Sequence, residues 1–215
     1  MTMNRYFAYG SNMNQEQMKK RVGEIAPLQL PPTSAKLRGY KLAFNKYTQN
    51  RSKEYDAKMG YPQGSTRVGA ANVIVSGNPK DVVEGIVYLL TDAQLKQLDK
   101  DEGFSSLNNG NPKGYKRKKI YLADGTQAET YIASIPENDP DQKLLPTRDY
   151  ILNFLEARHL LSDQYYNKFL TMQVLEDIRA PIVKPKITHE NLLFSDNKKS
   201  LNTGYPQPAP KPNQP

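Results

Sequence analysis

Three short stretches of the sequence combine residue types that can bind or transform a small acidic molecule. The first is the turn from Tyr9 to Asn12, where Gly10 lets the backbone approach a ligand closely. A short β-type run precedes the turn and a stretch of helical character follows it, so backbone N–H groups with partial positive charge are expected there. Such a turn can hold a carboxylate or a developing oxyanion, although Gly-Ser-Asn is also an ordinary turn before a capped helix.

The second stretch carries a carboxylate, Glu102, at the end of a predicted amphipathic helix. Gly103 and Phe104 follow it directly. The negative end of a helix dipole and an apolar neighbour both disfavour the charged form of a carboxylate, which makes the group a better proton acceptor. Glu102 can then act as a general base, whereas an exposed acid beside Asp99 and Asp101 would have no chemical role.

The third candidate is Tyr150, in the first turn of a predicted helix, where its hydroxyl can reach a pocket or its ring can join the core. Few other residues offer chemistry, because the chain has no cysteine and its two histidines, His159 and His189, have no suitable neighbours. A cysteine nucleophile, a thiolate metal site and a three-histidine zinc site are therefore excluded. We expect neither a metal nor a cofactor.

The composition indicates one soluble domain followed by a polar end. The chain has 215 residues, of which 37% are hydrophobic. No apolar run approaches the roughly 20 residues that span a bilayer, and no secretory signal is evident, so we expect a cytoplasmic protein without membrane contact. The segment from Pro181 onward has five lysines and two acids, and five prolines lie between Tyr205 and Pro215. We expect one domain at residues 4–180 and an extended tail at 181–215.

The net charge of +8 can indicate a nucleic-acid partner. Such a partner is usually bound by a compact basic cluster with interleaved aromatic residues, and the sequence has no such cluster. The run Lys116-Arg117-Lys118-Lys119 lies in a predicted strand, where side chains alternate between the two faces and only two of the four can share a surface. We therefore expect a solvated edge there and no nucleic-acid partner.

The predicted elements do not alternate regularly enough for a parallel sheet with a helix in every crossover. Strands are expected at 6–9, 41–45, 70–75, 82–90, 115–122 and 129–135, and helices at 14–24, 91–103, 147–157 and 162–175. Asn14 and Thr91 are expected helix caps, Asp124-Gly125 is expected to form a hairpin turn, and the polar stretch 46–67 is expected to be a long loop. This order predicts an α+β domain with a mixed β-sheet or small barrel flanked by helices.

Taken in order along the chain, these pieces resemble motifs of the gamma-glutamylcyclotransferase family. The matching runs are Tyr6-Phe7-Ala8-Tyr9-Gly10-Ser11-Asn12-Met13 at the N-terminus, Phe44-Asn45-Lys46 and Gly69-Ala70-Ala71-Asn72-Val73 in two intervening strands, Val83-Glu84-Gly85-Ile86-Val87-Tyr88-Leu89-Leu90 in the central strand, Leu98-Asp99-Lys100-Asp101-Glu102-Gly103-Phe104 at the catalytic glutamate, and Pro146 with Tyr150 in a later Pro-Ser-x-x-Tyr pattern in which Thr147 replaces serine. The resemblance covers about residues 4–170. The stretch 47–67 is longer than the family's usual connection, and the tail after Leu175 is not part of the common pattern.

The resemblance implies an enzyme that converts a γ-glutamyl amide into 5-oxoproline and releases an amine or amino acid, with no cofactor and no covalent intermediate. Glu102 would be the general acid/base that moves a proton from the α-amino group of the substrate to the leaving nitrogen. The substrate-binding residues that the resemblance implies are Tyr6, Phe7, Ala8, Tyr9, Gly10 and Ser11, with Tyr150 in the pocket. The expected partner is a small γ-glutamyl molecule, and the expected assembly is a monomer or homodimer.

One alternative is a non-catalytic module that keeps the scaffold and binds a small acidic ligand or a protein. Retention of Glu102 favours the enzyme, because a binding site alone does not require a carboxylate at that position. The sequence leaves the leaving group open among an α-amino acid, a polyamine, an ε-lysyl amine and a modified natural product. We expect the stretch 47–67 to border the pocket for this group.

Overall fold

The computed structural model describes residues 3–23, 31–103, 114–135, 144–179 and 181. The strands in these ranges are β1 (Met3–Ala8), β2 (Thr33–Arg38), β3 (Tyr40–Tyr47), β4 (Gly69–Val75), β5 (Val82–Thr91), β6 (Tyr115–Tyr121) and β7 (Gln127–Ala133). The helices are η1 (Ser11–Met13), α1 (Gln15–Val22), α2 (Gln49–Met59), α3 (Asp92–Asp101), α4 (Arg148–Leu155), η3 (Arg158–Leu160), α5 (Asp163–Leu170) and α6 (Leu175–Ile178). Phe104 and the predicted tail from residue 182 onward lie outside the described residues.

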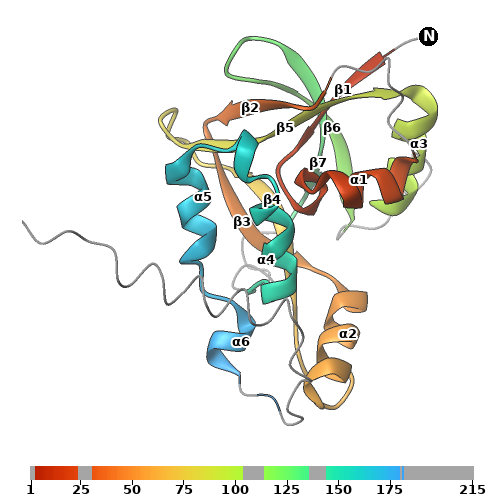
Figure 1. Ribbon diagram of the computed structural model, residues 1–215, viewed down its shortest axis with the longest axis vertical. Helices are drawn as coiled ribbons and strands as arrows, with labels where there is room; N and C mark the ends of the chain where they lie inside the picture. Colours follow the sequence, from red (N-terminus) through yellow and green to blue (C-terminus); the bar gives the residue numbers. More distant parts are fainter. Residues whose placement is uncertain (1–2, 24–30, 104–113, 136–143, 180, 182–215) are drawn as a thin grey trace, which may run out of the picture.

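Five strands form one mixed sheet in the order β2-β5-β1-β7-β6, and β3 pairs with β4 in a second sheet (Figure 1). Within the larger sheet β1 runs parallel to β7, and the other pairings are antiparallel. The predicted hairpin is confirmed, because β6 and β7 pair around Asp124 and Gly125. The predicted α+β class with a mixed sheet is confirmed as well.

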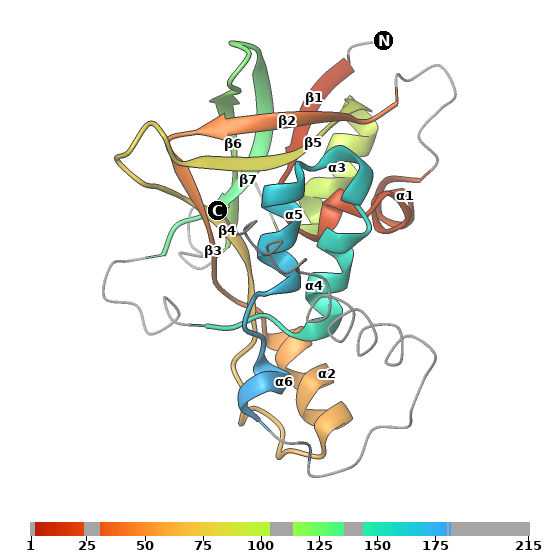
Figure 2. The same ribbon diagram turned by 60° about the vertical axis from the view of Figure 1, so that its left-hand side comes forward.

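The molecule is elongated, with the larger sheet at one end and α2 and α6 at the other (Figures 1 and 2). The β3–β4 ribbon runs between these two ends. Helix α1 packs against α3, and α4 packs against both α5 and η1. In the described ranges, no helix has the length and apolar character that crossing a membrane requires.

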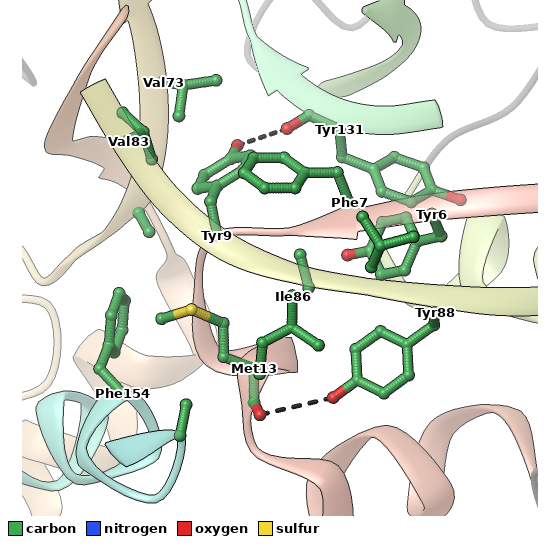
Figure 3. Close-up of a cluster of buried hydrophobic side chains, with 14 of the residues drawn as sticks. Tyr6, Phe7, Tyr9, Met13, Val73, Val83, Ile86, Tyr88, Tyr131 and Phe154 are labelled. Atoms are coloured by element: carbon green, nitrogen blue, oxygen red, sulfur yellow. Dashed lines mark hydrogen bonds between the residues drawn. The ribbon is translucent and has the colours of Figure 1, made fainter. Parts of the chain in front are cut away.

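Aromatic side chains from β1 and β5 occupy the centre of the core, as Figure 3 shows. Phe7 is fully buried, and the tyrosines around it keep their hydroxyl groups paired. Tyr88 donates to the carbonyl of Asn12 at 2.9 Å, and Tyr9 donates to the carbonyl of Tyr131. Because these bonds satisfy the polar end of each ring, β5 and the residue that follows β1 can place tyrosines inside the core.

Helix boundaries follow the capping residues that the sequence predicted. The Asn14 side chain accepts a hydrogen bond from the N–H of Gln17, at 3.0 Å, before α1. Thr91 opens α3 with the predicted capping box. Helix α3 ends with Glu102 as its C-cap, and Gly103 follows with a φ of +67°, a conformation that favours glycine. These local signals fix Glu102 at the end of α3.

The prediction of a long loop at 46–67 is wrong, because this stretch contains the 11-residue helix α2. The buried residues of α2 recur at helical spacing: Ser52, Tyr55, Asp56 and Met59. Two of the four, Ser52 and Asp56, are polar. The apolar pattern that predicts a helix is therefore interrupted. The carboxylate of Asp56 accepts from the N–H groups of Gly64 and Thr66, at 2.8 and 3.4 Å, and so orders the turn that follows.

Two smaller differences also have physical reasons. Strand β2 has no counterpart among the predicted strands, since it lies at the sheet edge and Leu37 alone of its six residues is buried. The helix predicted at 162–175 is divided, because α5 ends at Leu170 and α6 begins at Leu175. In both cases the tertiary environment outweighs the local sequence pattern.

One buried side chain bonds the β3–β4 ribbon to β7 of the larger sheet. The amide of Asn72 in β4 donates to the carbonyl of Ala133 in β7 and accepts from the N–H of the same residue, both at 2.9 Å. Asn72 has no exposed surface. Its side chain thus makes the pair of bonds that a neighbouring strand would make with its backbone, and it joins the two sheets.

A β-bulge in β3 frees the backbone of the residue beside this joint. The β3–β4 register shifts between Ala43 and Lys46, which leaves Ala71 without a partner in the ladder. Two tyrosine hydroxyls bond to Ala71 instead. Tyr150 of α4 accepts from its N–H at 3.1 Å, and Tyr115 of β6 donates to its carbonyl at 2.5 Å.

Gly85 of β5 lies where β1 approaches most closely, and this contact yields a stability prediction. A Cβ atom at Gly85 would lie 2.3 Å from the carbonyl oxygen of Ala8 and 2.7 Å from the ring of Phe7. We expect Gly85→Ala to lower the free energy of unfolding by about 1–3 kcal/mol, because β1 must shift to admit the methyl group. Chemical denaturation measures this change.

Ser34→Ala, at an exposed position in β2, is the control and should change stability by less than about 0.5 kcal/mol. Equal stability of Gly85→Ala and the parent would show that the close approach does not constrain the fold.

Candidate active site

A cavity of about 470 Å³ lies beside the end of β1, and two groups of residues line most of it. The group that we name the α3 side consists of Tyr6, Tyr9, Gly10, Ser11, Asn12, Arg21, Asp101, Glu102 and Gly103. The group that we name the α2 side consists of Lys46, Tyr47, Thr48, Gln49, Asn50, Arg51, Ala70 and Ala71. The lining is completed by Gly114, Tyr115, Tyr131 and Tyr150.

Glu102 is held on the α3 side by two donors that reach the same oxygen atom. Its Oε1 accepts from the side-chain amide of Asn12, at 3.1 Å, and from the guanidinium of Arg21. The side chains of Arg21 and Glu102 are 23% and 15% exposed. Among the described residues, Oε2 has no hydrogen-bond partner. The carboxylate is therefore oriented through one oxygen and free to bind a ligand with the other.

The cation beside Glu102 differs from the apolar surroundings that the sequence predicted. Helix α1 packs against α3, so the last turn of α1 brings Arg21 to the C-terminal end of α3. Burial alone would lower the pKa of Arg21, but the Glu102 carboxylate raises that pKa above its ordinary value. Arg21 is therefore a permanent positive charge in the cavity.

Asn12 also connects Glu102 to Tyr6. Its Nδ2 donates to the Tyr6 hydroxyl at 2.8 Å, while its Oδ1 accepts from Gln17 at 3.2 Å. Burial, and then the nearby charge of Glu102, raises the pKa of Tyr6 well above its ordinary value, so the hydroxyl stays neutral. No acceptor among the described residues takes the hydrogen of this hydroxyl, which leaves it available to a ligand.

The turn after β1 brings backbone donors to the same place. Helix η1 begins directly after Gly10, so the N–H groups of Ser11 and Asn12 have no acceptor within the turn. A Cβ atom on Gly10 would lie 3.2 Å from the Cβ of Ala71 and 3.5 Å from the Tyr150 hydroxyl. The absence of a side chain at Gly10 therefore keeps the space between the α3 side and the α2 side open.

The structure brings most of the predicted site residues together around the cavity. The predicted residues that line the cavity are Tyr6, Tyr9, Gly10, Ser11, Glu102 and Tyr150. The side chains of Phe7 and Ala8 do not line it, because they are packed in the core with 0% and 1% exposure. These two side chains support the strand that leads into the turn, and the assignment of Phe7 and Ala8 to the binding loop stays a prediction.

Several cavity residues carry no recognisable signal in the sequence. Arg21 lies four residues after Gln17 on α1, so helical spacing places the two on one face, but nothing indicates that this face meets α3. Arg51 belongs to the stretch that was expected to be a loop. The start of that stretch does border the cavity, and its relation to a leaving group stays a prediction. In the described ranges, no group of three or more histidine, aspartate or glutamate side chains is placed to hold a metal ion.

The partly buried ion pair between Arg21 and Glu102 yields a prediction about coupling. A double-mutant cycle with Arg21→Met and Glu102→Gln should give a coupling free energy of about 1–2 kcal/mol, reduced from that of a fully buried pair by residual exposure. Denaturant unfolding of the four proteins measures it. The pair Lys58–Asp149, whose side chains are 44% and 60% exposed, is the control and should give a smaller value. A larger coupling for the exposed pair would contradict the assignment.

Comparisons with known proteins agree with this architecture. Solved structures similar to the chain include the uncharacterized protein loc79017 from Homo sapiens (TM-score 0.58, 21% identity, covering 93% of this chain and 99% of that chain) and a protein named gamma-glutamyl cyclotransferase (TM-score 0.55, 21% identity, 93% and 99%). YkqA from Bacillus subtilis is also similar (TM-score 0.54, 21% identity, 78% and 53%). At this identity the likeness shows the fold alone. No curated protein sequence matches the chain.

The family comparison is more specific, because it matches the sequence itself. The family model described as gamma-glutamyl cyclotransferase, AIG2-like, matches residues 6–152. This range contains the turn after β1, the end of α3 and the first turn of α4. It thus contains every residue that lines the cavity. The chain belongs to the AIG2-like gamma-glutamyl cyclotransferase family.

Proposed function

We propose that the protein converts a γ-glutamyl amide into 5-oxoproline and releases the amine or amino acid that was bound to the γ-carbonyl. The α-amino nitrogen attacks the γ-carbonyl carbon of the same molecule, and the bond from that carbon to the leaving nitrogen breaks. The observation that carries the proposal is the carboxylate of Glu102, oriented through Oε1 and open at Oε2 inside the cavity. Membership of the family supports the same reaction class.

Glu102 is the residue that moves the proton in this proposal. An α-amino group has a pKa near 8, so at neutral pH it is mostly an ammonium ion and cannot attack a carbonyl. Oε2 accepts one proton from the ammonium group, and the resulting carboxylic acid then donates it to the departing nitrogen. The ring nitrogen loses its second proton to the released amine, so the enzyme ends unchanged. Since Asn12 and Arg21 hold Oε1, the geometry favours correct placement of the base.

The γ-carbonyl oxygen gains negative charge while the ring closes, and the cavity offers neutral donors for it. The Tyr6 hydroxyl is held by Asn12 at 2.8 Å and has a hydrogen to donate. The N–H of Ser11 begins η1 and lies in the same lining. Donors that are fixed before the reaction stabilise the developing charge without reorganisation, which is how they lower the barrier. Ring closure also profits from a bound pose that is already curled.

The function is tested with Glu102→Gln, which keeps the side-chain volume and removes the proton acceptor. Release of 5-oxoproline from a panel of γ-glutamyl compounds should fall by about 10²–10⁴-fold in turnover, while the melting temperature stays close to that of the parent. Glu156→Gln, at an exposed position at the end of α4, makes the same chemical change away from the cavity and should leave turnover unchanged.

Two results would contradict this function. Turnover of Glu102→Gln within threefold of the parent would remove Glu102 from the proton transfer. Tight binding of γ-glutamyl compounds without any release of 5-oxoproline by the parent would favour the non-catalytic binding module instead.

A further inference from the structure

The α2 side of the cavity carries positive charge without any acidic residue. Its two charged residues are Lys46 and Arg51, whereas the α3 side pairs its cation with acids. Lys46 donates to the carbonyl of Tyr47 at 3.0 Å. Among the residues that the structure describes, no acceptor bonds to the guanidinium of Arg51. Within the described part of the chain, the α2 side of the cavity therefore offers Arg51 no carboxylate partner.

The guanidinium of Arg51 is nevertheless held in position. It lies over the ring of Tyr150, 4.3 Å from the ring centre. The Tyr150 ring is itself fixed, because its hydroxyl accepts from the N–H of Ala71. A guanidinium stacked on an aromatic ring keeps its N–H groups free at the edge, in the geometry that binds a carboxylate through two hydrogen bonds.

The position of Arg51 in its helix is electrostatically unfavourable unless an anion is nearby. It lies in the first turn of α2, where the helix dipole disfavours a cation. Within the described residues, α2 is the α-helix without an acid in its first turn, while α1, α3, α4, α5 and α6 each have at least one. A bound carboxylate would relieve the repulsion and also bond to the guanidinium.

The charges of the two sides match one class of substrate. A γ-glutamyl amino acid presents one ammonium group and two carboxylates, whereas a γ-glutamyl amine lacks the second carboxylate. Glu102 suits the ammonium group, and Arg21 is already bonded to Glu102. Arg51 remains for a carboxylate, and it lies in the stretch that departs from the family pattern.

We propose that Arg51 binds a carboxylate of the leaving group, so that the protein selects γ-glutamyl amino acids over γ-glutamyl amines. The inference rests on the proposed cyclotransferase function and names the residue that decides between these substrates. Arg51 acts here as a specificity residue. The proton transfer at Glu102 proceeds for both kinds of substrate.

The test uses two compounds that differ by one carboxylate, γ-glutamyl-alanine and γ-glutamyl-ethylamide. The quantity measured is kcat/KM for release of 5-oxoproline. The parent should prefer γ-glutamyl-alanine by at least about tenfold, and Arg51→Met should lower kcat/KM for this compound by roughly 10–100-fold, the value of a charged hydrogen bond. The same variant should change kcat/KM for γ-glutamyl-ethylamide by less than about threefold.

Two further variants separate charge from structure. Lys53→Met removes an exposed positive charge two residues later in α2 and should leave the preference unchanged. Arg51→Lys keeps the charge but loses the two-pronged geometry, so it should retain part of the preference. It also keeps the proposal testable if Arg51→Met proves unstable by melting temperature.

The outcomes distinguish this inference from the function on which it rests. An equal loss for both compounds in Arg51→Met would show that Arg51 binds the shared γ-glutamyl half, and no loss for either would show that it binds neither; both overturn the inference and leave the cyclotransferase intact. If the parent releases no 5-oxoproline from any compound, the proposed function fails, and calorimetric Kd values for the same two compounds decide the inference. A lower Kd for γ-glutamyl-alanine than for γ-glutamyl-ethylamide, with the difference abolished in Arg51→Met, would support the inference. Equal Kd values for the two compounds, or no binding of either, would overturn the inference.

Discussion

The buried amide of Asn72 joins the two sheets, and the cavity depends on this joint. Without the paired bonds to Ala133, the β3–β4 ribbon would have no strand-like attachment to β7, and the α2 side would lose one of the contacts that place it opposite the α3 side. The β-bulge next to the joint has a related effect, because it releases Ala71 from the ladder and lets Tyr150 and Tyr115 bond to its backbone. An irregularity in pairing thus becomes the point where three elements meet.

The α3 side is organised by a different rule, in which distant segments share one small network. Asn12 is 90 residues away from Glu102 in the chain, yet its amide bonds to both Glu102 and Tyr6. Every donor and acceptor of this amide is used, so its orientation is determined, and it determines the orientation of the carboxylate in turn. Arg21 adds a permanent charge to the same oxygen. The site therefore relies on placement more than on an apolar environment, which is the reverse of what the end of an amphipathic helix suggested.

Local signals in the sequence were sufficient where the chain decides its own conformation. Asn14, Thr91 and Gly103 mark helix ends by hydrogen bonds or backbone angles that involve only near neighbours, and each was found from the sequence. Glu102 and the turn at Gly10 were recognised as candidate site residues because their sequence motifs resemble those of the family. The contact between Arg21 and Glu102 could not be found in this way, since it depends on how α1 packs against α3. Strand β2 was missed for a similar reason, because an edge strand with one buried residue has no alternation to detect.

Helix α2 shows how a polar stretch can form a well-ordered element that lines the cavity. Its buried face uses polar groups as anchors: the Ser52 hydroxyl donates to the carbonyl of Thr48 and accepts from the N–H of Val68, while Asp56 binds the turn that follows the helix. These bonds hold the helix in place without a continuous apolar stripe. Residues of the first turn are not among these anchors, and Arg51 there lines the cavity. Because the α2 side and the α3 side are built from separate segments, residues of the α2 side can change without disturbing the carboxylate at Glu102.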